Sequence, residues 1–154
     1  MAVREILVEG DPVLRKTSRE VKDVTPRIVS LLDDMRETLK MADGLGLAAP
    51  QVGVLRRLIV VSDGKKTLEL INPEIMESDG RSFESEGCLS VPGVSGKIYR
   101  PKTIRYRAVN RHGKTFMDYA DDLMARCICH EIDHLDGILI RDKIVEYDEA
   151  PEAK

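Results

Sequence analysis

Two histidines and one glutamate occur together in residues 127–137, in the order His130-Glu131-x-x-His134. On an α-helix, residues four apart project from the same face, one turn apart, so His130 and His134 could both bind one metal ion. Glu131 is next to His130 and could exchange a proton with a water molecule that the metal activates. The motif is short, and a helix that happens to carry two histidines is the alternative.

A third ligand is needed, because catalytic sites of this kind usually have three protein ligands and one open position. Cys88 is the best candidate, since it lies between two predicted strands, follows a glycine and could reach the metal from the side opposite the helix. Cys129 would point about 100° away from His130 around the helix. Cys127 suits a pocket wall better than a ligand position. A buried, inert thiol is the simpler interpretation of both Cys127 and Cys129.

Carboxylate groups are expected behind the two imidazoles, because a metal-bound histidine usually donates its second ring N–H to an acceptor such as a carboxylate. Glu86 and Asp133 are the candidates by their positions in the chain. Either of them could instead be a surface charge that faces solvent.

Two helices are predicted from apolar residues that recur at helical spacing. The first spans residues 26–42, where Thr25-Pro26 supplies an N-cap and a first helical proline, and Asp43-Gly44 ends the helix. The second spans residues 121–135 and carries the two histidines, with Asp121 as its N-cap and Gly137 as its C-terminal stop.

The run 44–53 is rich in glycine and small residues, and Gln51 is its polar exception. Its letters fit G-x-G-x-x-A, but a dinucleotide-binding motif of that form follows a strand and opens a helix. This run instead follows a predicted helix and precedes a predicted strand. We therefore interpret it as backbone that another group approaches closely, with an ordinary tight turn as the alternative.

Residues 56–118 are predicted to form β-structure. The strand candidates are 56–61, 67–71, 74–77, 103–109 and 114–117. Asn72-Pro73 is expected to separate the strand 67–71 from the strand 74–77. Apolar and polar residues alternate most clearly in 103–109, which predicts a strand with one buried face.

These elements predict one α+β domain over residues 1–154. Antiparallel or mixed β-structure would pack around the central metal-binding helix, and the amphipathic helix 26–42 would be the second helix, nearer the N-terminus. The tail from about residue 146 is polar and is expected to fray.

The composition argues against several classes of protein. The chain has 154 residues, of which 42% are hydrophobic and 33% charged, as in a globular protein large enough to bury a core. A net charge of −3 does not indicate a nucleic-acid partner. The first residues lack the apolar segment of a signal peptide, and no apolar run is long enough to span a membrane. We therefore expect a cytoplasmic protein with no membrane partner.

Three segments in one order, 44–51 (G-L-G-L-A-A-P-Q), 86–90 (E-G-C-L-S) and 130–134 (H-E-I-D-H), together resemble the peptide deformylases. The resemblance extends from about Asp11 to about Asp142. It implies a metal-dependent amidase that removes the N-formyl group from the initiator methionine of new bacterial proteins and releases formate. The implied partners are formyl-methionyl nascent peptides, with transient contact to the ribosome.

The resemblance also implies roles for individual residues. The ligands it implies for one divalent metal, usually Fe²⁺ with Zn²⁺, Ni²⁺ or Co²⁺ as replacements, are Cys88, His130 and His134. It implies Glu131 as the general acid/base. The groups implied to hold the substrate carbonyl oxygen are the Gln51 side chain and the Leu89 backbone N–H.

Substrate binding is implied for five further residues. Leu45, Leu123 and Cys127 would form walls of a pocket for the methionine side chain, although plain core packing is the alternative for each. The peptide backbone would pair with exposed backbone near Gly46 and Gly87, in the manner of an added strand.

Two other functions compete with this interpretation. An endopeptidase built on the same histidine motif would take its third ligand downstream, where Asp136 and Asp142 are the available carboxylates. A binding module with a structural metal site would usually have four protein ligands and no open position. Neither Glu131 nor Gln51 would be needed at such a structural site.

Overall fold

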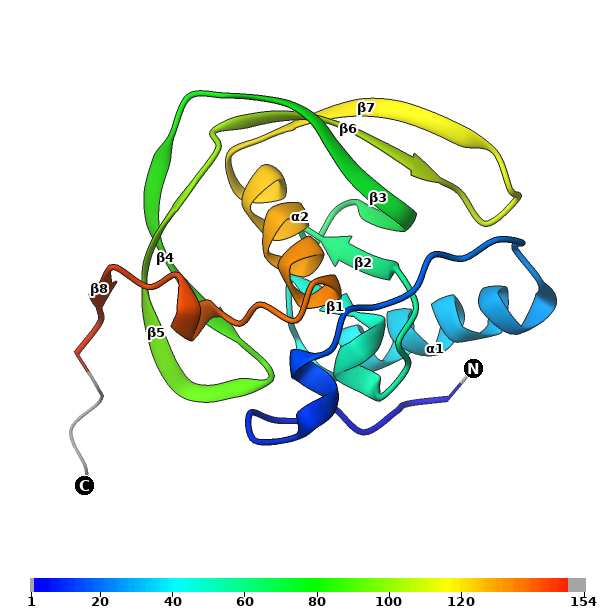
Figure 1. The fold of residues 1–154 in the computed structure, drawn as a ribbon, viewed down its shortest axis with the longest axis horizontal. Helices are drawn as coiled ribbons and strands as arrows, with labels where there is room; N and C mark the ends of the chain where they lie inside the picture. Colours follow the sequence, from blue (N-terminus) through cyan, green and yellow to red (C-terminus); the bar gives the residue numbers. More distant parts are fainter. Residues whose placement is uncertain (1, 150–154) are drawn as a thin grey trace.

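The computed structural model describes residues 2–149 and has an α+β architecture with two α-helices and two β-sheets (Figure 1). The elements in chain order are the short 3₁₀ helix η1 (Pro12–Arg15), α1 (Pro26–Ala42), β1 (Gly46–Ala48), η2 (Ala49–Val52), β2 (Leu58–Ser62), β3 (Thr67–Asp79), β4 (Ser82–Cys88), β5 (Val91–Arg100), β6 (Thr103–Val109), β7 (Thr115–Asp121), α2 (Asp122–Leu135), η3 (Ile140–Asp142) and β8 (Glu146–Tyr147).

The strands form a five-stranded sheet in the order β1-β2-β3-β6-β7 and a three-stranded sheet in the order β4-β5-β8. Every pairing between these strands is antiparallel. Figure 1 shows α2 at the centre of the molecule, between the β4–β5 hairpin and the five-stranded sheet. The predicted α+β fold, with β-structure packed around the histidine-bearing helix, is therefore confirmed.

The strand β2, which is second in the five-stranded sheet, is a continuous apolar run rather than an alternating one. Ile59 and Val61 belong to the core cluster that contains residues of α2, whereas Leu58 and Val60 belong to the cluster that contains residues of α1. Successive side chains of a strand point to opposite faces, so a helix on each face buries the whole run. Within residues 2–149, no helix combines the length and the apolar character needed to cross a membrane.

Both helix predictions are confirmed, with one difference at a cap. Thr25 accepts a hydrogen bond from the Ile28 N–H at 3.4 Å, and Asp43 ends α1 in the left-handed region at φ 53°. Asp121 occupies the N-cap position of α2, but its side chain makes no capping hydrogen bond. Gly137 follows the end of α2 at φ 74°, which glycine adopts without strain.

The expected break at Asn72-Pro73 is a bulge inside one long strand, β3, and not an end of a strand. Asn72 adopts φ 52°, and its amide donates to the Val21 carbonyl oxygen and accepts from the Val21 N–H. This side chain therefore binds the N-terminal segment at the point where the strand is irregular. The strand then resumes its pairing with β6.

The tail does not fray from residue 146. Glu146 and Tyr147 form β8, which pairs with β5. The Asp148 carboxylate accepts hydrogen bonds from the hydroxyls of Ser85 and Ser95 at 2.9 and 2.8 Å. These contacts order the polar tail through sheet pairing and side-chain hydrogen bonds. The rest of the expected frayed segment, residues 150–154, lies outside the described residues.

Candidate metal centre and substrate pocket

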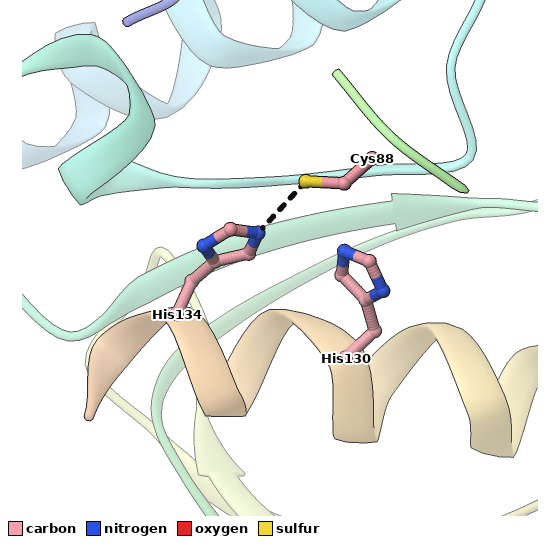
Figure 2. Close-up of side chains that lie close together, drawn as sticks. All are labelled: Cys88, His130 and His134. Carbon is pink, nitrogen blue, oxygen red and sulfur yellow. Dashed lines mark hydrogen bonds between the residues drawn. The ribbon is translucent and has the colours of Figure 1, made fainter. Parts of the chain in front are cut away.

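The structure brings together the three side chains predicted to bind a metal. His130 and His134 project from one face of α2 toward Cys88, as Figure 2 shows. One donor atom from each residue lies within 4.8 Å of the others, and the Cys88 sulfur is 3.2 Å from His134 Nε2. Cys88 is the last residue of β4, directly before a tight turn, so it reaches the helix from the opposite side.

Glu86 supports the first of the two histidines. Its Oε1 lies 2.8 Å from His130 Nδ1, which leaves Nε2 of that ring free for the metal. The same carboxylate accepts hydrogen bonds from Arg100 at 2.9 and 3.0 Å and from Arg126 at 2.6 Å. Burial opposes ionisation of Glu86, but the hydrogen bonds to His130 and Arg100 outweigh it and lower the pKa to about 2. Glu86 is therefore a buried anion behind His130.

Asp133, the other candidate, does not contact the second histidine. Its carboxylate accepts from Arg100 at 2.6 Å and lies 3.1 Å from the Lys143 ammonium. His134 Nδ1 is buried and has no hydrogen-bond partner among the described residues. Because adjacent residues of a helix point about 100° apart, Asp133 cannot turn back to its neighbour's ring.

The charges around the histidines suit a bound cation. Burial lowers the pKa of His130, but the charge of Glu131 and the hydrogen bonds with Cys88 and Glu86 raise it to about 10. Burial and the charge on His130 together lower the pKa of His134 to about 3. The site thus stabilises one positive charge at His130 and excludes a second proton from His134. A divalent cation held by a thiolate and two neutral imidazoles fits this donor set.

Glu131 lies beside the three donors as a carboxyl group without a structural partner. Its side chain is buried, and its Oε2 is 3.9 Å from His130 Nε2. Within residues 2–149, its Oε1 makes no hydrogen bond. Burial raises the pKa of Glu131 to about 7. A group with a pKa near neutrality can both accept and release a proton at physiological pH.

Gln51 is held so that its amide N–H₂ points toward the donor cluster. Its Oε1 accepts a hydrogen bond from the Ala48 N–H at 2.9 Å. Its Nε2 donates to the Ser90 hydroxyl at 3.0 Å and lies 3.8 Å from the Cys88 sulfur. Leu89, in the turn between β4 and β5, separates Cys88 from Ser90 and is half-buried. The amide N–H₂ can therefore serve a substrate atom placed beside Cys88.

A cavity of about 350 Å³ opens onto these groups. All five residues predicted to bind substrate line it, namely Leu45, Gly46, Gly87, Leu123 and Cys127. The side chains of Leu45 and Leu123 are each 48% exposed, so plain core packing does not describe them. Cys127 lines the cavity and also belongs to the core cluster below it.

Cys127 and Cys129, the two cysteines outside the cluster of donor atoms, are both buried. Burial raises the pKa of Cys127 to about 12 and that of Cys129 to about 11, so both are protonated thiols. Cys129 packs in the core beneath α2 and is not among the residues that line the cavity. The interpretation of both as inert thiols agrees with this placement.

Sequence reasoning missed Arg126, which also lines the cavity. It lies four residues before His130, so helical spacing could have placed it on the same face of α2. Arg100 was missed as well, and no local pattern indicates it. It contacts Glu86 only because β4 and β5 pair with Ser82 opposite Arg100.

The downstream carboxylates that an endopeptidase would need are engaged elsewhere. Asp136 accepts a hydrogen bond from Arg57 at 3.0 Å, and Asp142 forms an ion pair with Arg15. Neither is part of the cluster of donor atoms around Cys88. The structure therefore offers no support for a third ligand downstream of α2.

The chain is similar to known proteins over nearly its whole length. A family model described as polypeptide deformylase matches residues 3–150. The chain is 53% identical over 144 residues to the peptide deformylase of Agathobacter rectalis, which covers 94% of this chain and 91% of that protein. It is 53% identical over 146 residues to that of Alkaliphilus metalliredigens, with 95% and 99% covered. The crystal structure of peptide deformylase from Thermotoga maritima superposes with a TM-score of 0.91 at 39% identity, covering 94% of this chain and 99% of that one.

Proposed function

The chain belongs to the polypeptide deformylase family, and from that premise we propose which of its residues remove the formyl group from the N-terminal methionine of nascent proteins. One observation supports the assignment above all others. Cys88, His130 and His134 place three donor atoms within 4.8 Å of one another, and Cys88, His130 and Glu131 line one cavity. One carboxylate oxygen of Glu131 has no hydrogen-bond partner among the described residues.

We propose that these three side chains hold one divalent metal ion, which is Fe²⁺ in the natural enzyme. Zn²⁺, Ni²⁺ or Co²⁺ could take its place, because a thiolate and two imidazoles form a donor set that all of these ions accept. When bound, the ion supplies a Lewis acid that makes an attacking water acidic near neutral pH. Glu86 orients the His130 ring and keeps its Nδ1 protonated.

Glu131 moves the protons in this proposal. The Glu131 carboxylate accepts a proton from the attacking water, and the same group then donates that proton to the amine nitrogen of methionine as the amide bond breaks. The Gln51 amide and the Leu89 backbone N–H donate hydrogen bonds to the formyl oxygen while negative charge develops on it. Because Ala48 fixes the Gln51 oxygen, the amide needs no reorientation during the reaction.

The methionine side chain would occupy the cavity between Leu45, Leu123 and Cys127. The two half-exposed leucines lie at its mouth and offer apolar surface that becomes buried when substrate binds. The peptide backbone would run beside Gly46 and Gly87. We also propose that the enzyme works in the cytoplasm with transient ribosome contact, because its substrates are the N-termini of chains that are still being made.

Formate release from a formyl-methionyl peptide, compared with acetate release from the acetyl-methionyl peptide, tests this function. The reacting carbon must fit between Gln51, Cys88 and Glu131, and two of these side chains are almost fully buried. We expect the acetyl peptide, with one more methyl group there, to react at least about 100-fold more slowly. Equal rates for the two peptides, or cleavage of peptide bonds in an unformylated peptide, would contradict the proposal.

A further inference from the structure

Gly46 and Glu131 lie in unusually close contact. A Cβ atom added to Gly46 would come within 2.9 Å of both Cγ and Cδ of Glu131, and nearer still to Oε2. Real Cβ atoms essentially never approach other heavy atoms so closely. The hydrogen of Gly46 therefore occupies a place that no other residue type could fill without moving the Glu131 side chain.

The backbone itself does not require glycine at this position. Gly46 begins β1 and pairs with Val61 of β2, and its φ lies outside the left-handed region. An alanine would therefore fit the backbone of the strand, and the three atoms nearest to its Cβ would all belong to the Glu131 side chain. This differs from Gly137, which combines a φ of 74° with close backbone contact and is needed for the fold.

No hydrogen bond from the described residues fixes the orientation of the Glu131 carboxylate. In the described part of the chain Oε1 has no hydrogen-bond partner, and Oε2 lies 3.9 Å from His130 Nε2, which is too far for a hydrogen bond. The side chain is nevertheless buried, so packing must set its orientation. The Glu131 side chain packs against the backbone of β1 at Gly46.

We infer that Gly46 is a positioning residue for Glu131, because its missing side chain lets the carboxylate lie against β1 at the edge of the cavity. This inference rests on the proposed role of Glu131 and adds a second role to a residue expected only to pair with substrate backbone. A methyl group at position 46 pushes the carboxylate away from β1. Since a misplacement of about 1 Å can cost about 100-fold in rate, the effect on turnover is large.

The test is kcat and KM for a formyl-methionyl peptide with Gly46→Ala, and Gly87→Ala is the matched control. Gly87 also lines the cavity and is expected to pair with substrate backbone, but a Cβ there would meet nothing within 4 Å. We expect Gly46→Ala to lower kcat by about 100-fold with one metal still bound per chain. Gly87→Ala should affect KM more than kcat.

Coupling to Glu131 separates positioning from a general effect on the cleft. The loss of kcat caused by Glu131→Asp should be at least about tenfold smaller in the Gly46→Ala background than in the wild type, and unchanged in the Gly87→Ala background. If Gly46→Ala lowers the melting temperature, adding Glu131→Ala should restore it, because the methyl group then meets no carboxylate.

Wild-type kcat in Gly46→Ala, or additive effects of the two substitutions, would overturn the inference. A double variant as unstable as a destabilised Gly46→Ala would also overturn it. A different result, wild-type turnover in Glu131→Ala, would contradict the proposed function itself. An inactive Glu131→Ala protein beside a fully active Gly46→Ala protein would refute the positioning role alone.

Discussion

Replacing Glu131 by glutamine should lower kcat/KM for a formyl-methionyl peptide by about 10²–10⁴-fold. Glutamine keeps the size and shape of the side chain but can neither accept the proton of the attacking water nor return it to the leaving nitrogen. The cavity and the three donor atoms are unchanged, so metal content and the affinity for a methionine-containing product should stay close to wild type. Turnover above one tenth of the wild-type value would contradict the role of Glu131.

The pH dependence of the same two proteins gives a second check. Burial raises the pKa of Glu131 to about 7, and the positive charge of a bound metal lowers it. The active form carries an ionised carboxylate. The kcat/KM of the wild-type holoenzyme should therefore fall as the pH drops through a value below about 7. Glu131→Gln should lack this acid limb in its residual activity, and an identical limb in both proteins would assign it to another group.

Replacing Glu86 by glutamine should have the largest effect on stability. Glu86 is the shared acceptor of Arg100 and Arg126, both of which are also buried. Removing its charge leaves Arg126 without a carboxylate partner among the described residues and leaves Arg100 with Asp133 alone, close to His130. Breaking a buried ion pair on one side typically costs about 3–5 kcal/mol, and losing the partner of a ligating histidine weakens metal binding by about 10–100-fold. Chemical denaturation of the metal-free protein and a metal-binding titration measure the two effects separately.

Glu84→Gln is the matched control, since Glu84 lies on the same strand with an exposed side chain. The pH dependence of stability offers a further comparison. The pKa of Glu86 falls from 4.5 to about 2 on folding, because hydrogen bonds from His130 and Arg100 outweigh the opposing effect of burial. Its contribution is complete above pH 4.5 and is lost as the pH falls toward about 2. Glu86→Gln should not show this loss of stability at low pH. Equal stability of Glu86→Gln and Glu84→Gln would contradict the proposed role of the ion pairs between Glu86 and the two arginines.

Local patterns were enough to predict the elements that carry the site. The helical spacing of apolar residues and the caps at Thr25 and Gly137 depend on interactions within a few residues. The same is true of the one-turn separation of His130 and His134, which fixes their common face before any tertiary contact forms. Cys88 was placed opposite them on the inference that it lies between two strands, and the structure shows it as the last residue of β4.

The groups behind the histidines depend on strand register and could not be predicted in the same way. Helix geometry already disfavours Asp133 as the partner of the adjacent His134, but the pairing of Glu86 with His130 is visible only in the folded protein. Arg100 of β5 binds both carboxylates and leaves Glu86 within hydrogen-bond distance of the His130 ring. This arrangement depends on which residues the β4–β5 hairpin brings opposite each other, and that register is not visible in either segment alone.

The most direct test of the metal-dependent mechanism is a titration of metal-free protein with Fe²⁺ in the absence of oxygen, with bound metal and formate release measured on the same samples. We predict that activity rises in proportion to bound metal and saturates at one ion per chain. Cys88→Ala should bind no stoichiometric metal and stay inactive, while Cys129→Ala, which removes a buried thiol outside the cavity, should behave as the wild type. Full formate release without metal, or stoichiometric metal in Cys88→Ala, would contradict the account.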